Sequence, residues 1–69
     1  MADVHIELNG EARSYPAPVR LLGLLAALGL SPQAVAVERN GQLVPRDGFG
    51  ALELQDGDRL EIVRLVGGG

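Results

Sequence analysis

The stretch VRLLGLLAALG (residues 19–29) decides the fold of this 69-residue chain. Its leucines recur at helical spacing and form one apolar stripe, made of Leu21, Leu24, Leu25 and Leu28. The pattern predicts a helix over residues 19–28. Pro18 favours the start of this helix because its φ is already set, and Gly29 is suited to the position just after the end.

The opposite face of the predicted helix is weakly polar, with Arg20 as its only charge. The other residues on this face are mostly small: Val19, Gly23, Ala26 and Ala27. A helix that is apolar all round is normally buried, which a domain of this size cannot arrange. Two interpretations stay open: a compositional bias towards Ala, Gly and Leu, or a contact surface for a partner.

Upstream of the helix, apolar side chains stand at every second position, at Val4, Ile6 and Leu8. This alternation is typical of a half-buried strand. Asn9-Gly10 follows and predicts a type I′ hairpin turn, because both central residues of that turn need positive φ. Residues 11–15 are expected to form the returning strand.

The register of this hairpin places two charged residues on the side of the core. A two-residue turn sets Glu11 opposite Leu8 and Arg13 opposite Ile6. Charged side chains fit poorly there, so the end of the hairpin either projects past the core or contains a β-bulge.

Downstream of the helix, the pattern predicts three more strands, one that begins with Val35 and Val37 and two at residues 43–44 and 60–66. Asn40-Gly41 predicts a second tight turn between the first two of them. Residues 46–54 follow no regular period, and their larger apolar side chains are expected to fill the core: Phe49, Leu52 and Leu54. The last strand is apolar on both faces apart from Glu61 and Arg64, which suits a central strand.

The predicted order of elements is therefore β-β-α-β-β-β in an α+β fold. Parallel strands need a crossover, and the helix supplies it while burying its leucines on one face of a mixed sheet. This is the ubiquitin-like β-grasp arrangement, in which the first and last strands lie side by side and parallel. We expect one domain over residues 1–66 and a flexible glycine tail over residues 67–69.

Composition excludes most conventional active sites. The chain has no Cys and no Lys, so it offers no disulfide, no thiolate nucleophile and no side-chain amine. His5 is the only histidine, which leaves no triad and no zinc site. Asp56 and Asp58 match only part of a calcium loop, and two turn-forming carboxylates around Gly57 are the preferred interpretation. We therefore expect no autonomous enzyme.

Charge and hydropathy indicate the setting in which the chain works. The net charge of −3 disfavours nucleic acid or an anionic membrane as a partner. The longest apolar run, residues 21–30, is about half of what a membrane span requires. Without Cys or a glycosylation acceptor, a soluble cytoplasmic protein is the expectation.

Motifs that recur together in one family stand along the whole chain: Leu8-Asn9-Gly10-Glu11, Leu28-Gly29-Leu30, residues 35–40, Val44-Pro45-Arg46, residues 56–63 and Gly68-Gly69. With them the chain resembles the ThiS-type sulfur-carrier proteins of thiamine (thiazole) biosynthesis. Asp-Gly-Asp with a terminal diglycine is shared with the small subunit of molybdopterin synthase, whereas Val-Pro-Arg and the short length favour ThiS. Two positions depart from the family: Pro18 replaces a frequent Thr cap, and Phe49 a frequent Trp.

The resemblance implies a protein co-substrate with no bound cofactor. An E1-like (ThiF-type) adenylating enzyme would use ATP and Mg²⁺ to join AMP to the carboxylate of Gly69. A desulfurase system would supply persulfide sulfur to give a Gly69 thiocarboxylate, and thiazole synthase (ThiG-type) would take that sulfur. Gly67 and Gly68 would give the terminus access to narrow active sites, since glycine has no Cβ.

A surface for these partners is also expected. If Leu60 and Ile62 point inward, Val63 and Leu65 face the open side of the sheet beside the tail. They form either an interface, rimmed by Arg46, Arg59 and Arg64, or two scattered surface side chains. Rival functions are a molybdopterin-type sulfur carrier, a ubiquitin-like protein modifier and a binding module with an inert tail.

Overall fold

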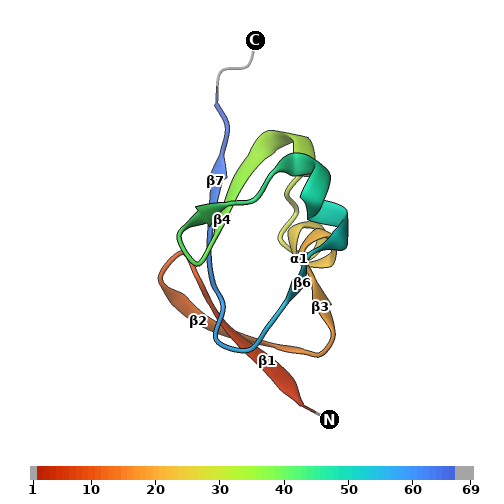
Figure 1. The fold of residues 1–69 in the computed structure, drawn as a ribbon, viewed down its shortest axis with the longest axis vertical. Helices are drawn as coiled ribbons and strands as arrows, with labels where there is room; N and C mark the ends of the chain where they lie inside the picture. Colours follow the sequence, from red (N-terminus) through yellow and green to blue (C-terminus); the bar gives the residue numbers. More distant parts are fainter. Residues whose placement is uncertain (1, 67–69) are drawn as a thin grey trace.

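A computed structural model of the chain describes residues 2–66 (Figure 1). Its strands are β1 (Asp3–Leu8), β2 (Glu11–Pro16), β3 (Val19–Arg20), β4 (Val35–Arg39), β5 (Gln42–Leu43), β6 (Glu53–Leu54) and β7 (Arg59–Arg64). One α-helix, α1, and two 3₁₀ segments complete it: α1 (Leu21–Ala27), η1 (Pro32–Ala34) and η2 (Arg46–Ala51). The predicted tail, residues 67–69, lies outside the described residues.

Five strands form a mixed sheet in the order β2-β1-β7-β4-β5, and β3 pairs with β6 in a separate ribbon. The first and last strands are neighbours and run parallel, with Glu7 opposite Arg59 and Leu8 opposite Leu60. β7 is central, as its two-sided apolar pattern predicts. The β-grasp fold predicted from the sequence is confirmed.

The N-terminal hairpin has the predicted register without a bulge. Leu8 pairs with Glu11 and Ile6 with Arg13. Asn9 and Gly10 have φ values of 50° and 84°, which a type I′ turn requires. Residues 11–14 are exposed, so the end of the hairpin projects past the core and keeps its charges in water.

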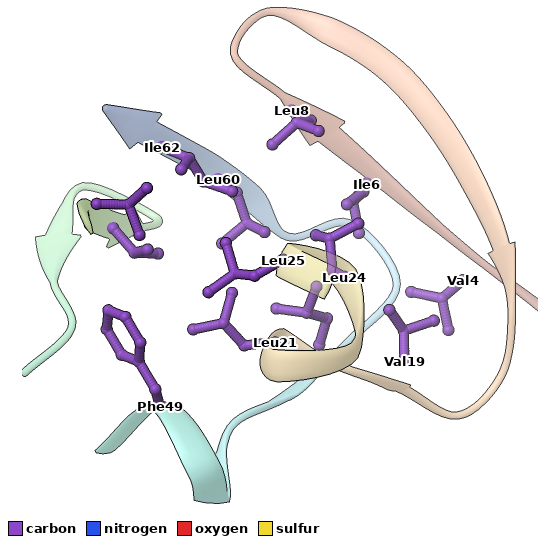
Figure 2. Close-up of a cluster of buried hydrophobic side chains, with 13 residues drawn as sticks. Val4, Ile6, Leu8, Val19, Leu21, Leu24, Leu25, Phe49, Leu60 and Ile62 are labelled. Atoms are coloured by element: carbon purple, nitrogen blue, oxygen red, sulfur yellow. The ribbon is translucent and has the colours of Figure 1, made fainter. Parts of the chain in front are cut away.

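The core lies between the sheet and α1 (Figure 2). Leu21 and Leu25 are completely buried and face Leu60 and Ile62 of the central strand. The other buried apolar side chains come from the strands, α1 and η2: Val4, Ile6, Leu8, Val19, Leu24, Val35, Val37, Phe49 and Leu54. Burial of each of these larger side chains contributes about 1.5–3 kcal/mol before chain entropy is subtracted.

The start of the helix differs from the prediction. Val19 and Arg20 form strand β3, and α1 begins only at Leu21. Val19 is buried and pairs with Leu54, and the backbone N–H of Leu21 donates to the carbonyl of Leu52 at 3.0 Å. This pairing with a segment about 35 positions away in the sequence overrides the local helical signal of Val19 and Arg20.

The remaining boundaries agree to within a residue or two. α1 ends at Ala27, and Gly29 has a φ of 73°, as expected for a residue just after a helix. On the outer face of α1, Gly23, Ala26 and Ala27 are exposed, whereas Val19, predicted for that face, belongs to the core.

No helix within residues 2–66 is long and apolar enough to cross a membrane.

Candidate functional site

The candidate site is the outgoing end of β7, which leads into the terminal glycines. Val63 and Leu65 are 59% and 54% exposed, while Leu60 and Ile62 of the same strand are buried. This alternation places Val63 and Leu65 on the open face of the sheet, away from α1, as predicted. Gly67, Gly68 and Gly69 lie outside the described residues.

On one side, β4 holds this end of β7. Arg64 lies opposite Val35, and the N–H of Leu65 donates to the carbonyl of Ala34 at 2.8 Å. The outer edge of β4 is covered in turn, because the guanidinium of Arg46 donates to the carbonyl of Val35 at 2.9 Å. The same guanidinium lies 5.9 Å from the ring centroid of Phe49, so Arg46 ties η2 to β4.

On the other side, β1 ends early, and one side chain continues its pairing with β7. The backbone N–H of Asn9 donates to the carbonyl of Leu60 at 2.9 Å. Its side-chain amide then binds both backbone groups of Ile62, accepting from the N–H at 2.8 Å and donating to the carbonyl at 3.2 Å. Asn9 therefore acts as both a turn residue and an anchor for the strand that carries the tail.

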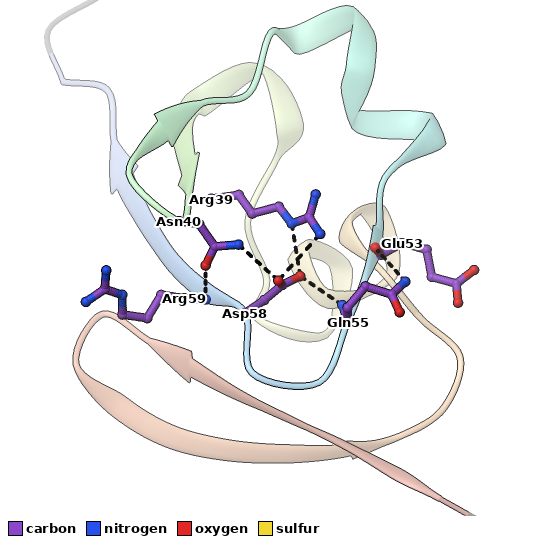
Figure 3. A network of polar contacts seen from close by, with 6 residues as sticks. All are labelled: Arg39, Asn40, Glu53, Gln55, Asp58 and Arg59. Carbon is purple, nitrogen blue, oxygen red and sulfur yellow. Dashed lines mark hydrogen bonds and ion pairs between the residues drawn. The ribbon is translucent and has the colours of Figure 1, made fainter.

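The start of β7 is fixed by a buried carboxylate (Figure 3). Asp58 is only 5% exposed and accepts hydrogen bonds from the backbone N–H of Gln55 at 2.8 Å and from Asn40 at 3.1 Å. It also forms an ion pair with Arg39 at 2.9 Å. Burial acts to raise the pKa of Asp58, but the hydrogen bonds and the charge of Arg39 outweigh it and lower the pKa.

Asp56 joins the same turn to β1. One of its carboxylate oxygens accepts a 2.7 Å hydrogen bond from the backbone N–H of His5 and lies 2.9 Å from Nδ1 of that side chain. These contacts lower the pKa of Asp56, the backbone hydrogen bond most strongly. Residues 2–66 contain no cluster of His, Asp or Glu that could hold a metal ion. The hydrogen bonds of Asp56 and Asp58 give these carboxylates the structural role at the turn that was predicted for them.

The structure does not bring the three predicted rim arginines together. Arg46 and Arg64 both adjoin Val35 at the outgoing end of β7. Arg59 stands at the opposite end of the strand, across from Glu7. Two of the three arginines therefore lie at the end of β7 that leads to the tail, and Arg59 lies at the other end.

Sequence reasoning missed the side chains that fix β7 in place. The sequence pattern marks Asn9 and Asn40 only as turn residues, and it does not indicate the Arg39–Asp58 pair. The available signal was the repeated Asn-Gly, since an amide at a turn beside a strand end can replace a missing backbone partner.

The chain is similar to known proteins of one family in both sequence and structure. A sequence model described as the ThiS family matches residues 6–69. The sulfur carrier protein ThiS of Bacillus subtilis is 35% identical over 65 residues, covering 93% of this chain and 98% of that protein. The crystal structure of a thiamine biosynthesis protein (ThiS) from Geobacter metallireducens superposes with a TM-score of 0.79 at 30% identity, covering 96% of this chain and 100% of that one.

A thiazole synthase of Magnetococcus marinus is 48% identical over 64 residues. The match covers 93% of this chain but 20% of that protein, so the chain spans about a fifth of this relative's length. The family model nevertheless extends over nearly the whole sequence, including its terminal glycines. The chain belongs to the ThiS family.

Proposed function

We propose that this protein is a sulfur carrier of thiamine biosynthesis and that Gly69 bears the sulfur as a thiocarboxylate. The observation that carries the proposal is the family match, which extends through residue 69. The terminal glycines follow β7, a central strand that pairs with β4 as far as Arg64 and is held on its other edge by Asn9 as far as Ile62. The chain itself is a co-substrate, and its partners perform the catalysis.

The proposed chemistry begins with activation, because a carboxylate is a poor electrophile. A carboxylate oxygen of Gly69 attacks the α-phosphorus of ATP on an E1-like (ThiF-type) adenylating enzyme, and pyrophosphate leaves. Persulfide sulfur from a desulfurase system then attacks the acyl carbon and displaces AMP. The product is an acyl disulfide that joins Gly69 to the sulfur of the donor. A second thiol of the donor system then attacks the donor's sulfur, forms a disulfide with it and releases the Gly69 thiocarboxylate. ATP and Mg²⁺ belong to the enzyme, and this chain needs no resident cofactor.

The composition of the chain suits this role. Three residues can span at most about 10 Å when fully extended, and Gly67 and Gly68 would present no side chain to a narrow channel. Because the chain has no Cys, it cannot hold transferred sulfur as a persulfide, and the terminal carboxylate has to carry it. With no Lys, the activated carboxylate meets no side-chain amine of its own protein. These reactions use ATP and thiols, and we place them in the cytoplasm.

Thiazole synthase is the proposed acceptor of the sulfur. In Magnetococcus marinus, a region similar to this chain forms a fifth of a polypeptide named thiazole synthase. Joining two modules raises their effective concentration, which benefits proteins that act on each other. A docking surface is available at Val63 and Leu65, two exposed apolar side chains on the open face of the sheet just before the tail.

The test is reconstitution with the cognate adenylating enzyme, ATP and Mg²⁺. Pyrophosphate release should depend on the full chain and should vanish for a matched chain that lacks Gly69. After addition of the sulfur donor, thiazole synthase should consume the thiocarboxylate, whereas molybdopterin synthase should not. Equal pyrophosphate release with and without Gly69 would contradict the role of the terminus, and ATP-dependent adducts with other proteins would instead favour a protein modifier.

A further inference from the structure

One edge of β7 is left without a partner at the end that leads to the tail. The parallel pairing with β1 stops at Leu8 and Leu60, and the side chain of Asn9 extends it only as far as Ile62. Beyond that point, β4 is the only strand beside β7 within residues 2–66 (Figure 1).

The direction of the backbone groups follows from the alternation along β7. Leu65 points its N–H towards β4, while Ile62 points both its N–H and its carbonyl towards the hairpin. Arg64 has the same parity as Ile62, so its N–H and carbonyl face the open side. Among residues 2–66, neither group has a backbone or side-chain partner.

The outer edge of β4 and the outer strand β2 are both protected. The carbonyl of Val35 is covered by Arg46, and that of Val37 accepts from the N–H of Val44 at 2.8 Å. The outer strand β2 carries charges and ends at Pro16, which discourages further pairing. An open edge in β7, next to the exposed Val63 and Leu65, contrasts with this protection.

We infer that the open edge at Arg64 receives an extended segment of thiazole synthase, which adds a strand to the sheet beside β7. This inference rests on the proposed function. Backbone hydrogen bonds to Arg64 would supply register, and apolar side chains of the added strand would cover Val63 and Leu65. Two observations favour thiazole synthase as the source of this segment. The open edge lies just before the glycines that must enter the synthase, and a relative joins the two modules in one polypeptide.

The added strand has a mechanical consequence for the tail. Pairing on both sides of β7 would fix the direction of the strand at Arg64, the last residue of the strand before the tail. Holding a reacting group in a fixed orientation lowers the entropic barrier to reaction. Asn9 ends the intramolecular pairing at Ile62 and so sets where the added strand begins.

The test compares Arg64→Pro with Arg64→Ala in the full chain. Both variants lack the guanidinium, but only proline removes the N–H that faces the open edge, a position where an edge strand tolerates proline. Affinity for the cognate thiazole synthase should fall by at least about tenfold more for Arg64→Pro than for Arg64→Ala. Unfolding curves establish that both variants are folded.

Amide hydrogen exchange in the wild-type protein gives a second readout that does not depend on a variant. The N–H of Arg64 should exchange rapidly in the free protein and slow at least about tenfold in the complex, whereas Leu65, already bonded to Ala34, should be protected in both. Binding by the wild type with equal affinities for the two variants and unchanged exchange at Arg64 would overturn the edge pairing alone. Protection by the adenylating enzyme but not by the synthase would overturn the assigned occupant. Absence of any wild-type binding to the synthase would contradict the proposed function as well.

Discussion

The anchor formed by Asn9 permits a quantitative test. Its side chain makes two hydrogen bonds with the backbone of Ile62, at 2.8 and 3.2 Å, in a partly buried setting. Its backbone has a φ of 50°, which is unfavourable for most residues with a side chain. The variants Asn9→Gly and Asn9→Ala separate these two contributions, because glycine tolerates this φ and alanine does not.

The magnitudes follow from the contacts. Each net hydrogen bond is worth about 0.5–1.5 kcal/mol, so Asn9→Gly should lower the free energy of unfolding by about 1–3 kcal/mol. Asn9→Ala should lose about 1–2 kcal/mol more from the left-handed conformation. For a domain stable by about 3–10 kcal/mol, both losses are large enough to measure.

Urea unfolding curves of the wild type and both variants, fitted with one shared m-value, give these differences in the free energy of unfolding directly. Amide exchange should show that the N–H of Ile62 loses protection in both variants while that of Leu65 keeps it. Stability of Asn9→Gly within about 0.5 kcal/mol of the wild type, together with unchanged exchange at Ile62, would refute the anchoring role.

Two further perturbations address the buried carboxylate and the open face. Asp58→Ala should cost about 2–3 kcal/mol in urea unfolding by leaving Arg39 unpaired. Because the folded pKa of Asp58 is lowered, its stabilisation is present above about pH 4 and is lost as the pH falls through the lowered value; Asp58→Asn should flatten this decline. Val63→Asp with Leu65→Asp should slow adenylation at least about tenfold in a pyrophosphate-release assay with the fold intact. Leu43→Asp, at an even more exposed apolar position on β5, should not; equal effects would argue against a localised surface.

Much of the fold was predictable because its signals are local. The alternation in β1, the Asn-Gly turns and the leucines of α1 each specify an element within a few residues. Their order then leaves few topologies, since parallel pairing of the first and last strands needs a crossover. The orientation of Val63 and Leu65 followed from the same period of two.

What was missed depends on contacts between distant segments. Val19 belongs to a strand because Leu54 lies opposite it, and no local pattern reveals that partner. The ion pair of Arg39 with Asp58, and the amide of Asn9 on Ile62, likewise join residues that only the folded sheet brings together. The separation of Arg59 from the tail has a different, local cause, because Arg59 is the first residue of β7 and the tail follows its other end.

The central claim is that Gly69 carries sulfur as a thiocarboxylate. Its most direct test is the intact mass of the full chain after incubation with ATP, the cognate adenylating enzyme and a sulfur donor, followed by fragmentation. We predict a shift equal to the replacement of one oxygen by sulfur, located at Gly69 and absent without ATP. An unchanged mass in the presence of active enzymes, or sulfur located on any other residue, would contradict the account.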